Sequence, residues 1–231
     1  MGFEGLPDDV ITRILLGMTI EDLLVTRATS ARICSLFEDS LPERFSKLPA
    51  SEVRRCIVTR FCQWRGRWPR CVLASLLKTP GLDLNAIDEV SGETPLVVAI
   101  RWKRLATARQ ILDAGAALDP GQPGSLTPLD WAARGLNCAA VETLVARRAD
   151  VDSQGCRGFT PLHWAVYERW SMCQERVLRV VECLLRNGAA ADIRNDDGLT
   201  PLGVARLPGY PHEGVRARLR AAEQRSRGAP F

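Results

Sequence analysis

Histidine and cysteine residues supply many of the nucleophiles, general bases and soft metal ligands of proteins. This chain of 231 residues has two histidines and eight cysteines, and the cysteines lie far apart, at positions 34, 56, 62, 71, 138, 156, 173 and 183. No Cys-x-x-Cys pair, Gly-rich phosphate loop, Gly-x-Ser-x-Gly turn or metal-spaced cluster of cysteine and histidine is present. The sequence therefore predicts no catalytic residue, no metal site and no cofactor, and we expect a protein that is not an enzyme.

The other residues that could carry out chemistry have simpler interpretations. His163 ends a repeated phrase, in which we expect its ring to make a local hydrogen bond, and His212 lies in a proline-rich turn. The acidic pair Asp196-Asp197 stands directly before a glycine, so it is interpreted as part of a hairpin turn rather than as a metal site.

One phrase recurs along the chain and predicts the elements that build it. Thr-Pro-Leu occurs four times, with the first three copies 33 residues apart and the fourth 40 residues later, starting at Thr94, Thr127, Thr160 and Thr200. A fixed period of this size indicates a solenoid of stacked units. From each threonine the sequence predicts a turn, a short helix that begins at the proline, a second helix with apolar residues three and four apart, and a polar hairpin. Such stacks usually present a surface to a partner, so we expect a binding protein.

Two features depart from the repeat. Gly115 and Gly188 follow second helices, where a left-handed residue ends the helix, but Arg148 takes this place in the repeat between them. A non-glycine residue in that conformation costs about 1–2 kcal/mol. About seven extra residues lie between Tyr167 and Val177, which predicts longer helices or a protruding loop.

These phrases resemble ankyrin repeats, and the copy that begins at Thr160 matches the pattern best. The resemblance implies an all-α fold with short β-hairpin fingers, an ankyrin-repeat solenoid preceded by a small three-helix domain. The predicted organisation is a separate N-terminal domain over 1–48, a basic helix and degenerate first repeat over 49–93, repeats over 94–126, 127–159 and 160–199, the last with the insertion, and a degenerate capping repeat and tail over 200–231. Atypical terminal repeats are expected because they act as caps.

The resemblance also implies where a target binds, because finger tips and exposed positions of first helices line the recognition face of such arrays. Carried onto this sequence, the predicted target-binding residues are Arg101, Trp102, Arg134, Arg157, Phe159, Tyr167, Glu168, Asp196, Asp197 and Leu199. Arginine, tryptophan and tyrosine dominate the energetics of many interfaces, so Trp102, Arg134, Arg157 and Tyr167 are the expected main contributors. Trp131 and Trp164 are interpreted as core residues that stack between repeats, with ligand contact as the alternative. Three arginines on this face predict a target with acidic and apolar surface.

Residues 1–48 do not fit the repeat and are predicted to form three short helices. Leu6-Pro7 opens the segment, Ile14-Leu15 lies in an apolar stripe, and Asp22-Leu23-Leu24 follows in the second helix. This pattern resembles an F-box, which implies docking on a Skp-type adaptor of a cullin–RING ubiquitin ligase. The contact residues would be Leu6, Pro7, Ile11, Ile14, Leu15, Leu23 and Leu24. The alternative interpretation is a helical cap on the solenoid.

The charge and hydropathy of the sequence bear on whether the protein binds nucleic acids or membranes. The segment from Arg54 to Arg70 holds six arginines around Trp64 and Trp68, which could indicate nucleic-acid binding through phosphates and stacked bases. An amphipathic helix with solvated arginines is the favoured interpretation, since no nucleic-acid motif accompanies them. No apolar run approaches the length of a membrane span and no signal peptide is recognised, so we expect no membrane association, reduced cysteines and a cytoplasmic or nuclear location.

The sequence as a whole predicts a protein-binding substrate receptor. Its array would select an unknown protein target, and its N-terminal segment would recruit the ligase, so that ubiquitin transfer becomes effectively intramolecular. The alternative is an ankyrin-repeat scaffold or inhibitor that acts through the array alone.

Overall fold

The computed structural model describes residues 73, 77, 82–87, 92–119, 124–167, 174–207 and 212–228. The chain divides into two units, Met1–Val98 with Ala106–Ala116, and Ala99–Leu105 with Ala117–Phe231. The predicted F-box-like segment, with all seven adaptor-contact candidates, lies outside the described residues, as does Glu168.

The described chain is helical, as the repeat pattern predicts, and it contains no strand in the ranges given above. Its α-helices are α6 (Pro95–Arg101), α7 (Leu105–Asp113), α8 (Pro128–Arg134), α9 (Cys138–Ala146), α10 (Pro161–Tyr167), α11 (Gln174–Arg186), α12 (Pro201–Ala205) and α13 (Glu213–Gly228), and a 3₁₀ turn, η1 (Cys156–Gly158), lies between α9 and α10. None of these helices is both long and apolar enough to cross a membrane.

Each Thr-Pro-Leu phrase starts a short first helix in the way the sequence predicts. The threonine hydroxyl accepts a hydrogen bond from the backbone N–H three residues later, at 3.4, 3.1, 3.4 and 3.2 Å for Thr94, Thr127, Thr160 and Thr200. The proline then occupies the first helical position, where a backbone N–H would have no acceptor within the helix, so its absence costs no hydrogen bond. The leucine of every phrase is buried, at no more than 2% exposed, so the same three residues cap the helix and anchor it in the core.

The second helices end on left-handed residues. Gly115 has φ of 96° and Gly188 has φ of 90°, which confirms the predicted glycine caps. Arg148 keeps the same geometry with φ of 66°, although it has a side chain. The backbone therefore stores strain at one of three otherwise equivalent positions.

Arg148→Gly is expected to raise the free energy of unfolding by about 1 kcal/mol, because glycine adopts this conformation without the Cβ clash. The change should appear as a higher urea midpoint with an unchanged slope. Arg147→Gly is the matched control, since Arg147 has φ of −92° and glycine there should destabilise the protein. Equal effects of the two substitutions would contradict the assignment of strain to Arg148.

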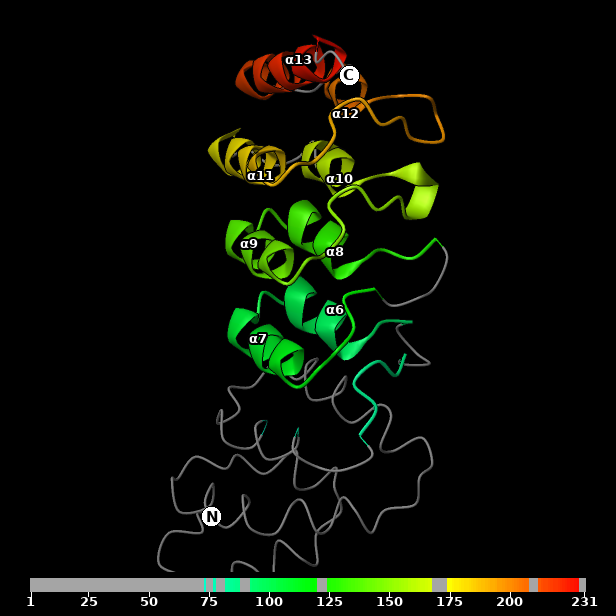
Figure 1. Ribbon diagram of the computed structural model, residues 1–231, viewed down its shortest axis with the longest axis vertical. Coiled ribbons are helices and arrows are strands. Elements are labelled where there is room, and N and C mark those ends of the chain that lie inside the picture. Colours follow the sequence, from blue (N-terminus) through cyan, green and yellow to red (C-terminus); the bar gives the residue numbers. More distant parts are fainter. Residues whose placement is uncertain are drawn as a thin grey trace, which may run out of the picture. The chain divides into compact units, whose positions relative to one another are not determined.

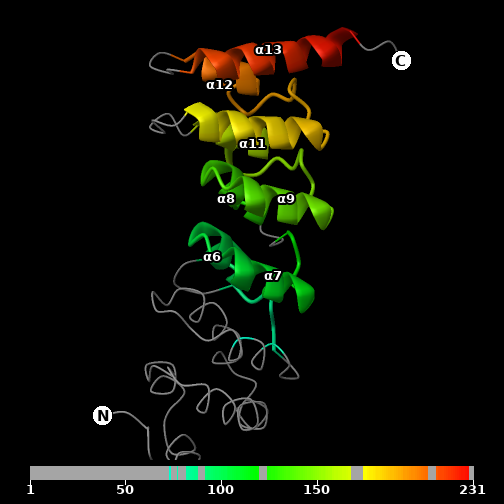
Figure 2. The ribbon, with the colours of Figure 1, turned by 90° about the vertical axis from the view of Figure 1, so that its left-hand side faces the viewer.

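Within the second unit the helices form stacked pairs. First helices α8, α10 and α12 lie in one row, and second helices α9, α11 and α13 lie in the other (Figures 1 and 2). Fully buried leucines from successive layers, such as Leu144, Leu162 and Leu184, fill the space between the rows. Helix α13 is rich in arginine, and Arg218 on it pairs with Glu182 on α11 at 3.7 Å.

The insertion lengthens a helix. Helix α11 has 13 residues, whereas α7 and α9 each have nine, so part of the extra sequence forms an additional turn of the second helix. Residues 168–173, which complete the insertion, are outside the described ranges.

The fingers between repeats are turns rather than β-hairpins with paired strands. In the finger over 155–159 the Gly155 N–H donates to the Phe159 carbonyl at 3.1 Å, and in the next finger the Asn195 N–H donates to the Leu199 carbonyl at 2.9 Å. One such bond per finger is too few for a strand ladder, which explains the difference from the expected short strands.

Candidate target-binding face

Arginine and tryptophan side chains alternate across the first helices of successive repeats. The Arg101 guanidinium lies over the rings of Trp102 and Trp131, at 5.8 and 5.6 Å from their centroids. The Arg134 guanidinium lies over Trp131 and Trp164, at 5.3 and 5.6 Å. We call these five residues the arginine–tryptophan ladder. Cation–π contacts of this kind contribute about 0.5–2 kcal/mol each.

The 33-residue period produces this alternation. Arg101, Arg134 and Tyr167 occupy one register position at the ends of α6, α8 and α10, and Trp131 and Trp164 share another position one turn earlier. Stacked repeats place equivalent positions above one another, so two sequence columns interleave into one row of cations and rings.

The ladder becomes more exposed toward α6. Trp164 is 6% exposed, Trp131 and Arg134 are half-buried, and Trp102 is 41% exposed. Among the described residues, Trp102 is the exposed large hydrophobic side chain. The core interpretation is thus confirmed for Trp164, whereas Trp131 lies half-buried between two guanidinium groups. The indole N–H of Trp164 is buried and has no acceptor among the described residues.

An aromatic cluster continues the ladder into the fingers. Phe159 packs against Trp164 with centroids 4.8 Å apart and against Tyr167 at 5.3 Å, while Trp164 and Tyr167 meet edge to face at 5.6 Å. Arg157 lies over the outer side of Phe159 at 5.5 Å. Phe159 itself is only 2% exposed. The expectation that its ring contacts a target therefore needs correction: the ring packs against Trp164 and Tyr167, with the Arg157 guanidinium over it.

Neighbouring fingers are tied to each other at their tips. Arg157 pairs with Asp197 at 3.0 Å, with about half of each side chain exposed. The Asp196 N–H donates to the Arg157 carbonyl at 3.1 Å. An exposed ion pair of this kind contributes little stability, so its main effect is to orient the two side chains on the surface. Asp196 is also exposed, and Leu199 is half-buried.

Gly158 is required where the fingers meet. Its φ is 63°, and a Cβ there would lie 2.9 Å from the backbone nitrogen of Asp196 and closer still to its carboxylate. Gly158→Ala is expected to lower the free energy of unfolding by about 2 kcal/mol or more, because the clash adds to backbone strain. Gly198→Ala is the matched control, since Gly198 has φ of 74° but open space around its Cβ position. Urea unfolding that gives equal losses for both variants would contradict a close finger–finger approach.

His163 serves the architecture. Its Nδ1 accepts hydrogen bonds from the N–H and hydroxyl of Thr160, at 3.2 and 2.8 Å, so Nε2 carries the proton and donates to the Leu199 carbonyl at 3.0 Å. Burial lowers the pKa of His163, so the neutral ring persists. The expected local hydrogen bond is confirmed, and the structure adds a bond to the next repeat. A histidine held in this way has no ring nitrogen left for acid–base chemistry.

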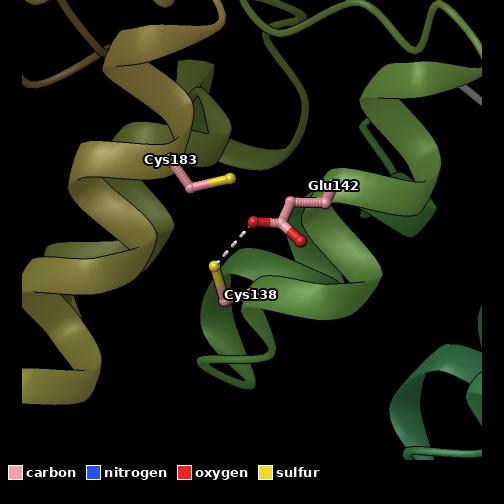
Figure 3. A group of neighbouring side chains, drawn as sticks. All are labelled: Cys138, Glu142 and Cys183. Atoms are coloured by element: carbon pink, nitrogen blue, oxygen red, sulfur yellow. Dashed lines mark hydrogen bonds between the residues drawn. The ribbon is translucent and has the colours of Figure 1, made fainter.

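One side-chain cluster was missed by sequence reasoning, which predicted no metal site. Cys138, Glu142 and Cys183 place their ligand atoms within 4.8 Å of one another, although the two cysteines are 45 residues apart (Figure 3). The insertion shifts α11 out of the simple 33-residue register, so no fixed spacing in the sequence signals this approach.

The comparisons with known proteins agree with the repeat architecture. Residues 157–196 match the family model for the ankyrin repeat. Human "SH3 and multiple ankyrin repeat domains protein 2" is 34% identical over 113 residues, which is 47% of this chain and 6% of that protein. The fowlpox virus ankyrin repeat protein FPV031 is 30% identical over 131 residues, 54% of this chain and 37% of the viral protein. Palmitoyltransferase AKR1 of Lachancea kluyveri is 27% identical over 146 residues, 62% of this chain and 19% of that enzyme.

The chain thus spans well under half the length of each of these curated relatives, and the similarity concerns repeats rather than whole proteins. The capped helix pairs, the left-handed helix ends, the tied fingers and the family match all describe the same unit. Together they support the presence of ankyrin repeats in this chain, and such repeats imply binding to other proteins.

Proposed function

We propose that the array binds an acidic protein segment that also carries apolar side chains, and that the arginine–tryptophan ladder is the surface that holds it. The observation that carries this proposal is the unbroken alternation of guanidinium and indole groups across three successive first helices. A regular row of this kind suits an extended or helical segment that presents carboxylates and apolar groups in turn.

The chemistry of the ladder favours such a target. Stacking on indole faces fixes each guanidinium, so less side-chain entropy is lost when it binds a carboxylate. Trp102, the exposed end of the row, supplies apolar area of the type that dominates interface energetics. The Arg157–Asp197 pair marks the finger end, where the positive charge of Arg157 is already partly balanced.

A selection from a random peptide library on the immobilised full chain tests the ladder. We expect selected peptides to be rich in aspartate, glutamate and apolar residues, and to lose at least about tenfold in affinity for Arg101→Gln/Arg134→Gln. Arg109→Gln/Arg147→Gln is the matched control, because both arginines are exposed on or beside second helices. Peptides without acidic enrichment, or peptides that bind the ladder variant as well as the wild type, would refute this surface.

We further propose that the protein is a substrate receptor, with residues 1–48 recruiting a Skp-type adaptor and cullin–RING ligase in the cytoplasm or nucleus. Support comes from the F-box-like order of Leu6-Pro7, Ile14-Leu15 and Asp22-Leu23-Leu24. The other candidate is a scaffold or inhibitor in which the array acts without a ligase.

A reciprocal pull-down separates these two functions. A Skp-type adaptor should be retained by the wild type and by Arg101→Gln/Arg134→Gln, and lost from Leu6→Ala/Pro7→Ala/Leu23→Ala, which should still bind the selected acidic peptides. Absence of the adaptor from every lane, with peptide binding intact, would leave the scaffold function.

A further inference from the structure

Two thiols and a carboxylate converge between consecutive second helices. Cys138 and Glu142 lie on α9, and Cys183 faces them from α11 (Figure 3). The Cys138 thiol donates to a Glu142 carboxylate oxygen over 3.7 Å, and all three ligand atoms lie within 4.8 Å of one another. Cys183 is buried, Cys138 is half-buried and Glu142 is exposed, so the cluster is anchored in the core and open to solvent on one side.

The helices themselves position these groups. Cys138 is the first residue of α9 and Glu142 follows four residues later, a spacing that puts both side chains on one face of a helix. Helices α9 and α11 pack against each other, which brings Cys183 opposite that face. Asn187 directs its side-chain N–H groups to the carbonyl of Cys183 at 2.7 Å and to its sulfur at 3.8 Å. Hydrogen bonds to ligand atoms of this kind commonly orient the ligands of a metal.

The ligand types select the metal. Two sulfurs and one carboxylate oxygen suit Zn²⁺ and its analogues Cd²⁺ and Co²⁺, whereas Mg²⁺ and Ca²⁺ take oxygen ligands. Tetrahedral coordination with ordinary Zn–S and Zn–O bond lengths separates a sulfur and an oxygen by about 3.6 Å. The observed 3.7 Å between Cys138 and Glu142 already meets this requirement. A fourth ligand could be water, since the site opens to solvent at Glu142.

We propose that Cys138, Glu142 and Cys183 form a Zn²⁺ site that ties the second helices of consecutive repeats together. Such an ion would act as a structural link next to the recognition surface, because α9 and α11 pack behind α8 and α10, which carry much of the ladder. This inference is independent of the proposed partners.

The environment of Cys183 explains how protons and metal would compete. Burial first, and then the nearby Cys138 and Glu142, raise the pKa of the Cys183 thiol to about 11, while Arg186 acts in the opposite direction. A divalent cation would take the place of the thiol protons and relieve the repulsion among three acidic groups. Its binding should therefore release protons and strengthen as the pH rises.

Titration of the reduced, chelator-treated full chain with Cd²⁺ and Co²⁺ tests the site. We expect thiolate–metal charge-transfer absorption that saturates at one equivalent, and visible Co²⁺ bands typical of a tetrahedral site. Cys138→Ser and Cys183→Ala should lose this signal, and Glu142→Gln should bind at least about tenfold more weakly. Cys156→Ser is the matched control, because Cys156 is half-buried but lies outside the cluster.

Thermal unfolding gives a second readout. Zn²⁺ should raise the melting temperature of the wild type and of Cys156→Ser, and should leave Cys138→Ser unchanged. Because Cys138 is only half-buried, Cys138→Ser should fold, and its circular dichroism spectrum checks this. The test then does not depend on Cys183→Ala, in which a buried residue is changed. Charge-transfer absorption that persists in Cys138→Ser/Cys183→Ala would overturn the proposal. The proposal would also be overturned if Cys138 and Cys183 formed a disulfide and the reduced protein bound no Cd²⁺.

Discussion

The free energy of unfolding of the wild type is expected to decrease by about 2–3 kcal/mol between pH 5 and pH 8 because of Asp130, and Asp130→Asn should abolish this decrease. Asp130 occupies the position that His163 fills in the next repeat, and its side chain is completely buried. One carboxylate oxygen accepts the Thr127 N–H at 2.9 Å, but the other has no hydrogen-bond partner among the described residues. Ionising this carboxyl therefore places a poorly compensated charge in the core.

The direction of the effect follows from the pKa of Asp130. Burial raises this pKa from 3.8 to about 7, although hydrogen bonding with the backbone and the side chain of Thr127 acts in the opposite direction. The folded state consequently binds more protons than the unfolded state between these values. The contribution of protonated Asp130 to the free energy of unfolding is fully present below about pH 4. It decreases as the pH rises and is lost above about pH 7. Asparagine keeps the acceptor for Thr127 and carries no charge at any pH.

Urea unfolding of both proteins at several pH values measures the effect, and the difference between them isolates Asp130. The buried ring of His163 works in the opposite direction, since burial lowers its pKa and protonation at low pH destabilises the fold. This contribution is common to both proteins and cancels. Asp113→Asn is the control, because Asp113 is exposed on α7. A variant whose stability follows the same pH course as the wild type would show that Asp130 is not the buried acid responsible.

The helical repeat was predictable because its signals are local. Threonine caps, proline at the first helical position and glycine after the second helix each act within a few residues, and all are observed where the sequence places them. Arg148 illustrates the same point, since the neighbouring repeats identified it as the residue that would be held in a strained conformation. Local signals also sufficed to place Arg101, Arg134 and Tyr167 on the first helices.

Features that depend on how side chains meet across repeats were not predictable. The approach of Cys138 to Cys183 depends on the register of α11 after the insertion, and no motif encodes it. The inward direction of Phe159 depends on the conformation of a finger in which Arg157 has φ of 61° and Gly158 has φ of 63°. Residues in this conformation interrupt the regular side-chain alternation that an extended finger would have. A sequence pattern alone does not specify that geometry.

Phe159→Ala is expected to lower the free energy of unfolding by about 3–5 kcal/mol, the largest loss of any single change considered. The ring is 2% exposed and joins His163, Trp164 and Tyr167 with centroid separations of 5.3, 4.8 and 5.3 Å. Its removal would leave a cavity between α10 and the finger, and the surrounding rings are too large to fill it by small shifts. Urea or thermal unfolding measures the loss directly.

Phe159→Leu separates the two roles of the ring. Leucine should keep most of the stability because it fills much of the cavity, but it offers no aromatic face to Arg157, which lies 5.5 Å from the ring centre. If Phe159 organises the recognition face from within, this variant should bind the selected acidic peptides more weakly while remaining folded. Tyr167→Leu, at a half-buried position in the same cluster, provides the comparison. A Phe159→Ala variant destabilised by less than about 1 kcal/mol would mean that the ring is accessible to a partner, as the sequence alone suggested.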